Sequence, residues 1–142
     1  MTTNQATANS IINLVLSATT WAGVAINATS SPITQIYCSL HSSDPGATGN
    51  QTTNEIAYTG YSRVAVSRSG GWTTATTGSS SPVSSISFPT GTGGTGTATF
   101  AALGTASNGT GSILWSGPMS PAIVCGNGVT PTLTTGSSLV VS

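Results

Sequence analysis

The sequence predicts an all-β protein: a β-sandwich, with a jelly-roll-like arrangement favoured, preceded by a short N-terminal helix. Three observations lead to this prediction. β-Branched residues are abundant, with 26 threonines beside many valines and isoleucines, and such residues suit a pleated, half-buried surface. Short segments with apolar residues at alternate positions recur, separated by Gly, Pro, Ser or Asn. Charged residues make up only 3% of the 142 residues and the net charge is zero, whereas disordered chains usually carry a high net charge.

The N-terminal region is the one place where the pattern favours a helix. Residues 1–8 are polar and are expected to be extended. A helix is predicted over residues 10–18, with Asn9 or Ser10 as its N-cap. Its apolar residues would bury one side over two turns: Ile11, Ile12, Leu14, Val15 and Leu16. A strand is the alternative, because short apolar runs fit both. We expect the arm formed by residues 1–30 to make contacts between subunits.

From Pro32 onward the apolar pattern has a period of two residues. In the segment 33–41, alternate residues form two sets on opposite faces: Ile36, Cys38 and Leu40 on one, and Tyr37, Ser39 and His41 on the other. A long loop, residues 42–60, follows, and loops of this length often form interfaces. The remaining predicted strands are 61–68, 71–76, 83–88, 96–103, 111–116, 121–125, 129–134 and 137–142. Without a repeat or a linker, the chain is predicted to form a single domain, residues 1–142.

The charged side chains are few and gathered in one window. The four that are fully charged at pH 7 are Asp44, Glu55, Arg63 and Arg68; there is no lysine, and the one histidine, His41, lies beside the window. Because most enzyme chemistry needs proton donors, acceptors or charged clamps, we expect no catalytic, cofactor-binding or metal-binding residues. Two arginines cannot neutralise a phosphate track, so nucleic acid is not an expected partner.

Structural roles are expected for the charged window. His41 and Asp44 with nearby serines could suggest a Ser-His-Asp arrangement, but a serine-rich chain supplies such neighbours by chance. Asp44 is expected to begin an Asx turn, and His41 to bind a backbone group at a strand end. One of Arg63 and Arg68, which would point to opposite faces, is expected to pair with Glu55 or Asp44 and fasten the long loop to the sheet. An exposed pair of this kind contributes only about 0–1 kcal/mol.

Other motifs also favour structural interpretations. The glycine-rich segment 91–96 is interpreted as a turn between strands, because phosphate-binding loops need a following helix and usually a lysine. Cys38 and Cys125 are expected to be buried free thiols, with a disulfide as the alternative. The apolar run 11–16 is too short to span a membrane and lacks the flanks of a secretory signal. We therefore expect cytoplasmic synthesis and no membrane partner.

The surface composition suggests a protein that works inside an assembly. A surface solvated by hydroxyls and amides has almost no like-charge repulsion to keep copies apart. The bulky aromatic residues are expected to pack mostly in the core, with one or two exposed as interface anchors or sugar-stacking platforms. They are Trp21, Trp72, Trp115, Tyr37, Tyr58 and Tyr61.

One stretch resembles a known family: Leu40-His-Ser-Ser-Asp-Pro-Gly-Ala-Thr-Gly49, followed by Asn54-Glu-Ile-Ala-Tyr-Thr-Gly-Tyr-Ser-Arg-Val-Ala-Val66. These blocks are similar to the Leu-His-x-x-Asp-Pro-Gly and Gly-Tyr-x-Arg-x-x-Val blocks of small virion proteins of tailed bacteriophages. Segments 93–99, 104–106 and 128–135 resemble that family too, so that the resemblance covers most of the chain from about residue 9. Phe100 and Ala101 depart from the family pattern, in which a strand with a histidine is expected.

The resemblance implies a capsid cement or decoration protein with a jelly-roll-like fold, located on the exterior of the virion capsid. Its partners would be the major capsid protein at capsomer joints and further copies of itself, as a homodimer or homotrimer at symmetry axes. It would stabilise the shell against the pressure of the packaged DNA. The alternative is a tail-associated or fibre module that binds a host surface glycan. An enzyme, such as a glycan hydrolase using Asp44 and Glu55, is a third hypothesis.

Overall fold

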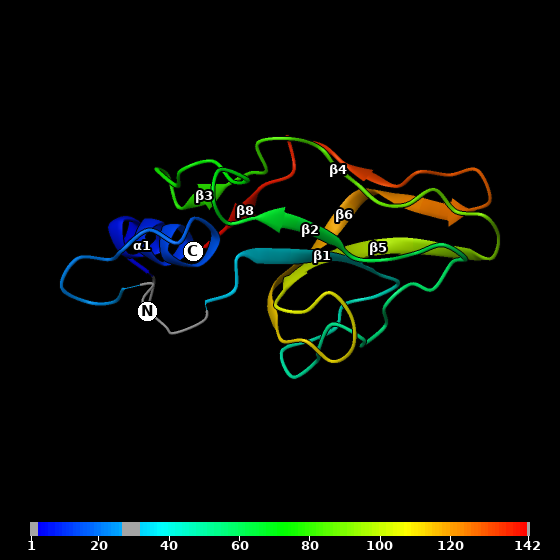
Figure 1. Ribbon diagram of the computed structural model, residues 1–142, viewed down its shortest axis with the longest axis horizontal. Helices are drawn as coiled ribbons and strands as arrows, with labels where there is room; N and C mark the ends of the chain where they lie inside the picture. The colour runs from blue at the N-terminus through cyan, green and yellow to red at the C-terminus, as the bar shows by residue number, and fades with distance from the viewer. Residues whose placement is uncertain (1–2, 27–31, 142) are drawn as a thin grey trace. The chain divides into compact units, whose positions relative to one another are not determined.

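The computed structural model describes residues 3–26 and 32–141. It confirms the all-β class with one short N-terminal helix (Figure 1). The chain divides into two compact units. We call them the helix unit (residues 1–35, 67–85 and 133–142) and the sheet unit (residues 36–66 and 86–132). The single domain and the jelly-roll arrangement stay predictions, as does the interface role of residues 1–30, part of which lies outside the described residues.

In the helix unit, helix α1 (Gln5–Leu16) begins earlier than expected. The predicted caps Asn9 and Ser10 and the extended start were wrong, because Asn4 caps the helix by accepting a hydrogen bond from Ala6 N at 2.9 Å. The buried face is narrower than the apolar run suggested, since only every fourth residue is fully buried: Ala8, Ile12 and Leu16.

Polar helix residues explain why the apolar pattern missed residues 5–9 of the helix. Asn9 accepts a hydrogen bond from Gly78 N at 2.6 Å and donates one to Thr76 O at 3.0 Å. One turn later, Asn13 accepts from Ala75 N at 2.8 Å and donates to Ala75 O at 3.3 Å. The helix is therefore held on the segment 75–78 by side-chain amides, in addition to the burial of Ala8 and Ile12.

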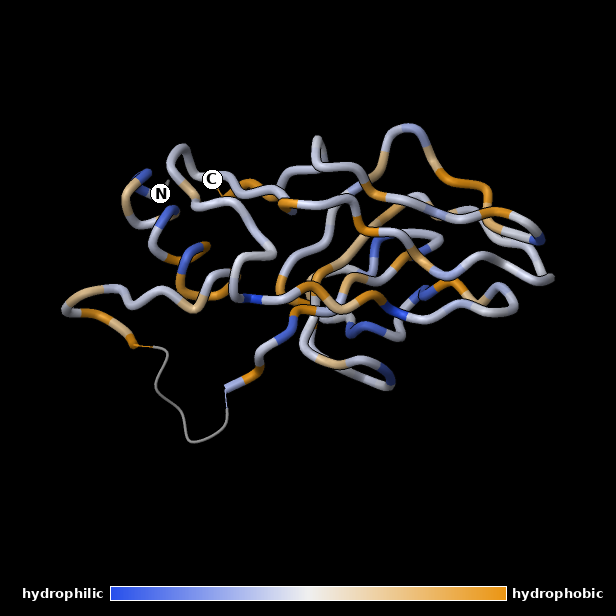
Figure 2. The backbone as a smooth tube through the Cα atoms, turned by 45° about the horizontal axis from the view of Figure 1, so that its top comes forward, coloured by the Kyte–Doolittle hydropathy of each residue, from blue (hydrophilic) through white to orange (hydrophobic). Residues whose placement is uncertain are grey.

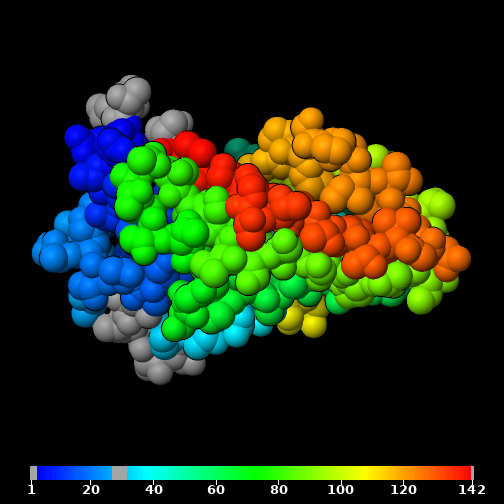
Figure 3. All heavy atoms as spheres, turned by 90° about the horizontal axis from the view of Figure 1, so that it is seen from above, coloured from blue at the N-terminus to red at the C-terminus, as the bar shows by residue number. Residues whose placement is uncertain are grey.

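Two short strands complete the helix unit. β3 (Ser79–Ser80) pairs with β8 (Leu139–Val140) in antiparallel register, and Figure 3 shows the C-terminal segment in red against the green segment that contains β3. The predicted strand 71–76 was wrong: its one pairing is an isolated bridge between Trp72 and Pro82, because tight turns break the segment. Residue 142 of the predicted strand 137–142 lies outside the described residues.

The sheet unit is built on a four-stranded sheet with the order β2-β1-β5-β6. Its strands are β2 (Val64–Ser67), β1 (Gln35–His41), β5 (Thr95–Gly104) and β6 (Ile113–Gly126). β5 pairs antiparallel with β1 and with β6. From Cys38 to His41, β1 is buried on both faces, which shows that other segments cover both sides of the sheet there.

β6 joins two segments, 111–116 and 121–125, that were predicted as separate strands. Its register against β5 shifts between Ala98 and Phe100, where residues 119–122 bulge out opposite a single residue of β5. β4 (Ile86–Ser87) and β7 (Thr132–Leu133) form a further two-stranded sheet. Both are much shorter than the predicted segments 83–88 and 129–134.

The tube in Figure 2 is mostly pale, because Ser, Thr and Gly have hydropathies near the middle of the scale. The strongly apolar residues that the sheet unit buries are few: Ile36, Leu40, Ile56, Tyr58, Ile86 and Phe88. Among the described residues, no helix has the length and apolar character needed to cross a membrane.

Candidate functional site

The charged window folds into a buried ion pair. Arg63 Nε lies 2.7 Å from Glu55 Oε1, and Arg63 Nη2 lies 2.7 Å from Glu55 Oε2. The prediction that an arginine pairs with Glu55 is confirmed, but the expected exposure was wrong: the side chains are only 3% and 15% exposed. The free-energy contribution expected for an exposed ion pair therefore does not apply to this buried, bidentate pair.

Arg63 also connects the long loop to a second loop. Its Nη1 donates to Ala106 O at 3.0 Å and its Nη2 to Gly109 O at 2.8 Å. These two residues belong to the connection 105–112 between β5 and β6, so one guanidinium fixes two loops at once. The hydrogen bond from Glu55 raises the pKa of Arg63 above its ordinary value, so that Arg63 stays charged at any physiological pH.

Tyr61 extends this cluster towards the central strand. Its hydroxyl donates to Glu55 Oε1 at 2.9 Å and accepts from Leu40 N at 3.0 Å. Burial raises the pKa of Tyr61 well above its ordinary value. Its ring stacks on Phe88 with centroids 6.2 Å apart and meets Tyr58 edge-on at 5.4 Å. Both carboxylate oxygens of Glu55 are thus occupied by internal donors.

His41 is buried completely and bound on both ring nitrogens. Its Nδ1 lies 2.8 Å from Thr53 O, so that it carries the proton, and its Nε2 accepts from Ser39 Oγ at 2.9 Å. Desolvation by burial lowers the pKa of His41 below its ordinary value, which favours this neutral form. The expected bond to a backbone group is confirmed. A Ser-His-Asp triad is not formed, because a carbonyl occupies the place of the carboxylate.

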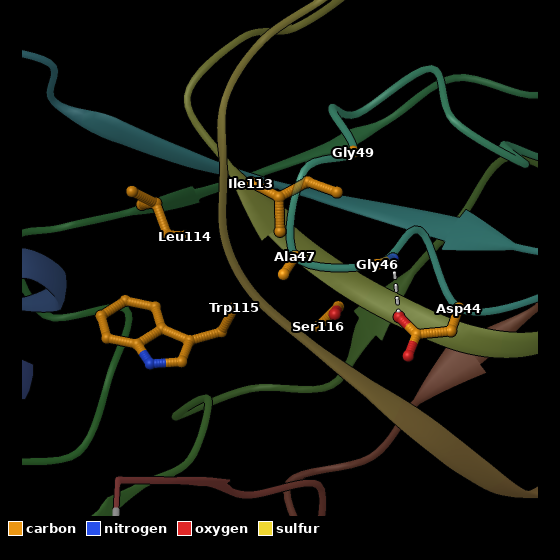
Figure 4. Close-up of a pocket in the computed structure, with 8 residues that line it drawn as sticks. All are labelled: Asp44, Gly46, Ala47, Gly49, Ile113, Leu114, Trp115 and Ser116. Carbon is orange, nitrogen blue, oxygen red and sulfur yellow. Dashed lines mark hydrogen bonds between the residues drawn. The ribbon is translucent and has the colours of Figure 1, made fainter.

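Asp44 is the one charged side chain that faces solvent. It begins the expected Asx turn: Gly46 N donates to its Oδ1 at 2.9 Å, and Asn54 Nδ2 donates to its main-chain oxygen at 3.1 Å. It lines an open pocket of about 280 Å³ between residues 44–49 and residues 113–116 of β6. Figure 4 shows the indole of Trp115 on the side of β6 away from Asp44. The pocket therefore does not place a stacking platform opposite the carboxylate.

Arg68 lies in the helix unit and has a different environment. Its guanidinium donates to three main-chain oxygens, those of Val15 at 2.6 Å, Leu14 at 2.7 Å and Ile33 at 2.8 Å. Leu14 and Val15 belong to the last turn of α1, where unpaired carbonyls attract a cation. Burial lowers the pKa of Arg68 from its ordinary value.

The cysteines and the glycine-rich segment have structural positions. Cys38 and Cys125 are buried free thiols, as expected, and burial raises the pKa of Cys38 to about 12. The segment 91–96 leads into β5 rather than into a helix, so it does not form a phosphate-binding loop. The expected turn was wrong: Gly91 and Gly93 form isolated β-bridges, and residues 95–96 already belong to β5. Within the described ranges, no group of three or more His, Cys, Asp or Glu side chains could hold a metal ion.

Gln51 is a buried residue that sequence reasoning missed. Its side chain has no exposed surface. It accepts from Ala106 N at 3.0 Å and donates to Tyr37 O at 3.4 Å. A Cβ added at Gly104 or Gly111 would collide with it. Gly104 and Gly111 indicate in the sequence that another group approaches the backbone closely at these positions. The sequence does not show that this group is the side chain of Gln51.

The comparisons with known proteins identify the family. No curated protein matches the chain. The sequence model of one family, Gp80, described as podophage GP4 fiber I protein gp80, matches residues 2–140. That match spans nearly the whole chain and both units. The coarser part of the resemblance drawn from the sequence, to structural proteins of phages, is thereby confirmed, and the chain belongs to the Gp80 family of phage fibre proteins.

Proposed function

We propose that this protein is a non-enzymatic structural component of a phage virion, located in a fibre, and that it works by docking neutral β surfaces against neighbouring proteins. Membership of a family described by a podophage fibre protein supports the location. The internal contacts made by most of the charged side chains support docking through neutral surfaces.

One observation carries the proposal: three of the four charged side chains make internal contacts. Arg63 and Glu55 neutralise each other, and Arg68 binds main-chain oxygens. Only Asp44 is left to act on a partner through charge. A surface of hydroxyls, amides and apolar groups recognises partners by shape and hydrogen bonds.

The enzyme hypothesis gains no support from the same cluster. A hydrolytic pair would need both Asp44 and Glu55 free to reach a substrate, and the Glu55 oxygens are held by Arg63 and Tyr61. Loss of a hydrolytic activity in a Glu55→Gln variant that remains folded would reverse this conclusion.

The capsid cement role is the finer alternative. It uses the same neutral docking but places the protein on the shell, against the major capsid protein, in hundreds of copies. A fibre protein would instead be present in few copies and would remain with the tail or fibre fraction, where binding of a host glycan stays a prediction.

Fractionated virions distinguish the two roles. Purified particles would be separated into shell and tail or fibre fractions, and the protein counted by quantitative mass spectrometry, with a known shell protein and a known tail protein as internal standards. Few copies in the tail or fibre fraction is the result expected. Hundreds of copies on the shell would establish the cement role instead, and absence from the particle would overturn both.

A further inference from the structure

β6 lies at an edge of the four-stranded sheet, and its outer side has no strand beside it. The sheet order ends at β6, so in residues 3–26 and 32–141 β5 is the only strand hydrogen-bonded to it. At 14 residues it is the longest strand of the chain. A free edge presents a row of backbone donors and acceptors that can pair with another strand.

The pairing of the inner strands decides which residues face this open edge. The backbone N–H and C=O of Leu40 in β1 point away from β5, because the N–H donates to Tyr61 Oη and the C=O accepts from Ile56 N. Leu40 lies opposite Ala101, so Ala101 directs its own backbone groups towards β6. There it lies opposite Gly117.

Antiparallel strands alternate, so the neighbours of Gly117 must direct their backbone groups outward. These neighbours are Ser116 and Pro118. Proline has no N–H and occurs in sheets where none is needed, which agrees with this assignment. Ser116 is exposed, and its N–H and C=O face the open edge without a partner among the described residues.

Native proteins protect such an edge with charged side chains, prolines or bulges; β6 has no charged side chain, and its prolines and its bulge lie from residue 118 onward, beyond Gly117. Its large apolar residues are left half-exposed or exposed, including Val124 at 68%. Pro118 and the bulge at residues 119–122 interrupt the edge on one side, and a second register shift against β5 falls at Leu114, so Trp115–Gly117 is the regular part that is open to pairing. A pocket of about 280 Å³ lies beside this segment and has room for a side chain of an added strand.

We propose that the Trp115–Gly117 edge pairs antiparallel with the same edge of a second copy of this chain, about a two-fold axis beside Ser116. The Ser116 N–H of each copy donates to the Ser116 C=O of the other. Two identical edges meet most readily where like charges do not repel; β6 has no charged side chain, and Asp44 in the adjacent pocket is the one charged side chain near the edge. The inference rests on the proposed function in one respect, that the protein works within an assembly.

Substitution of Ser116 by proline tests the pairing. Ser116→Pro removes an N–H that β5 does not use, so the fold should persist, while the dimer should weaken by at least about tenfold because both copies lose a donor. Ser116→Ala keeps the N–H and serves as the matched control. Sedimentation velocity over a concentration series should show a dimer for the unchanged protein and for Ser116→Ala, and a monomer for Ser116→Pro. Association that survives Ser116→Pro with an unchanged circular dichroism spectrum would overturn the proposal.

If the Ser116→Pro variant does not fold, amide hydrogen exchange of the unchanged protein tests the same pairing. The Ser116 amide has no partner among residues 3–26 and 32–141, so its protection should rise with protein concentration, whereas the Gly117 amide is protected at every concentration. Fast exchange at Ser116 at all concentrations, or a protein that stays monomeric, would refute the proposal. The proposed function is tested separately, by the location of the protein in fractionated virions. Neither result of the dimer experiment decides that test.

Discussion

The helix unit and the sheet unit each contain one buried arginine, and the two are stabilised in different ways. Arg63 in the sheet unit binds a carboxylate and two carbonyls. Arg68 in the helix unit binds three carbonyls and no carboxylate. Their pKa values move in opposite directions: the hydrogen bond from Glu55 raises that of Arg63, and burial lowers that of Arg68.

The two arginines therefore stabilise the fold in two different ways. Arg63 and Glu55 form a neutral pair that fixes two loops to a sheet. Arg68 instead brings together main-chain oxygens from the end of α1 and from Ile33. Removal of either arginine should therefore destabilise the protein, but only one removal leaves a charge stranded.

The largest effect is expected for Arg63→Met. This change leaves Glu55 mostly buried without its cation, so the free energy of unfolding should fall by about 3–5 kcal/mol. Urea denaturation followed by circular dichroism measures it. The double variant Arg63→Met/Glu55→Gln removes the stranded charge and should recover a large part of the loss. Equal stability of the single and double variants would show that the pair is not the reason for the loss.

A smaller effect is expected for Arg68→Met. The carbonyls of Leu14, Val15 and Ile33 lose a donor but no charge is stranded, so the loss should be about 2–3 kcal/mol. Combination with Glu55→Gln should give no recovery, in contrast to the Arg63 variant. Lysine keeps the charge but not the planar fork, so Arg68→Lys should recover less than half. Full recovery by lysine would mean that charge alone matters at the end of α1.

These arginines also show how much the sequence could predict. The pairing of Arg63 with Glu55 and the Asx turn at Asp44 followed from local chemistry and from the scarcity of partners. The burial of the pair did not follow, because it depends on the connection 105–112 closing over it. Asn9 hid the early start of α1, since its amide binds a distant segment instead of adding to an apolar pattern. The continuity of β6 through Pro118 was missed because an edge strand tolerates proline.

The pH dependence of stability should separate the two units. Burial lowers the folded-state pKa of His41 below the ordinary value of 6.5, so the unfolded chain binds the proton more readily. The contribution of His41 to stability is therefore full above about pH 6.5 and is lost as the pH falls from there through the folded-state pKa. In hydrogen exchange at pH 5 and pH 7, sheet-unit amides near Thr53 should lose protection at the lower pH.

His41→Gln supplies the control for this effect. The variant lacks the one side chain whose ordinary pKa lies between pH 5 and pH 7, because His41 is the only histidine. Its unfolding free energy should be flat between pH 5 and pH 7. A fall in the variant as large as in the unchanged protein would assign the effect to other groups.

The central claim, that neutral surfaces and not charges hold this protein in its assembly, is tested most directly with Asp44→Asn. This variant removes the only charged side chain that faces solvent and keeps an oxygen for the Gly46 N–H bond. The measurement is the copy number of the variant in virions grown from a phage that carries the substitution. If neutral surfaces hold the protein in its assembly, the copy number of the variant equals that of the unchanged protein. A several-fold loss from particles, with the variant folded in solution, would contradict it.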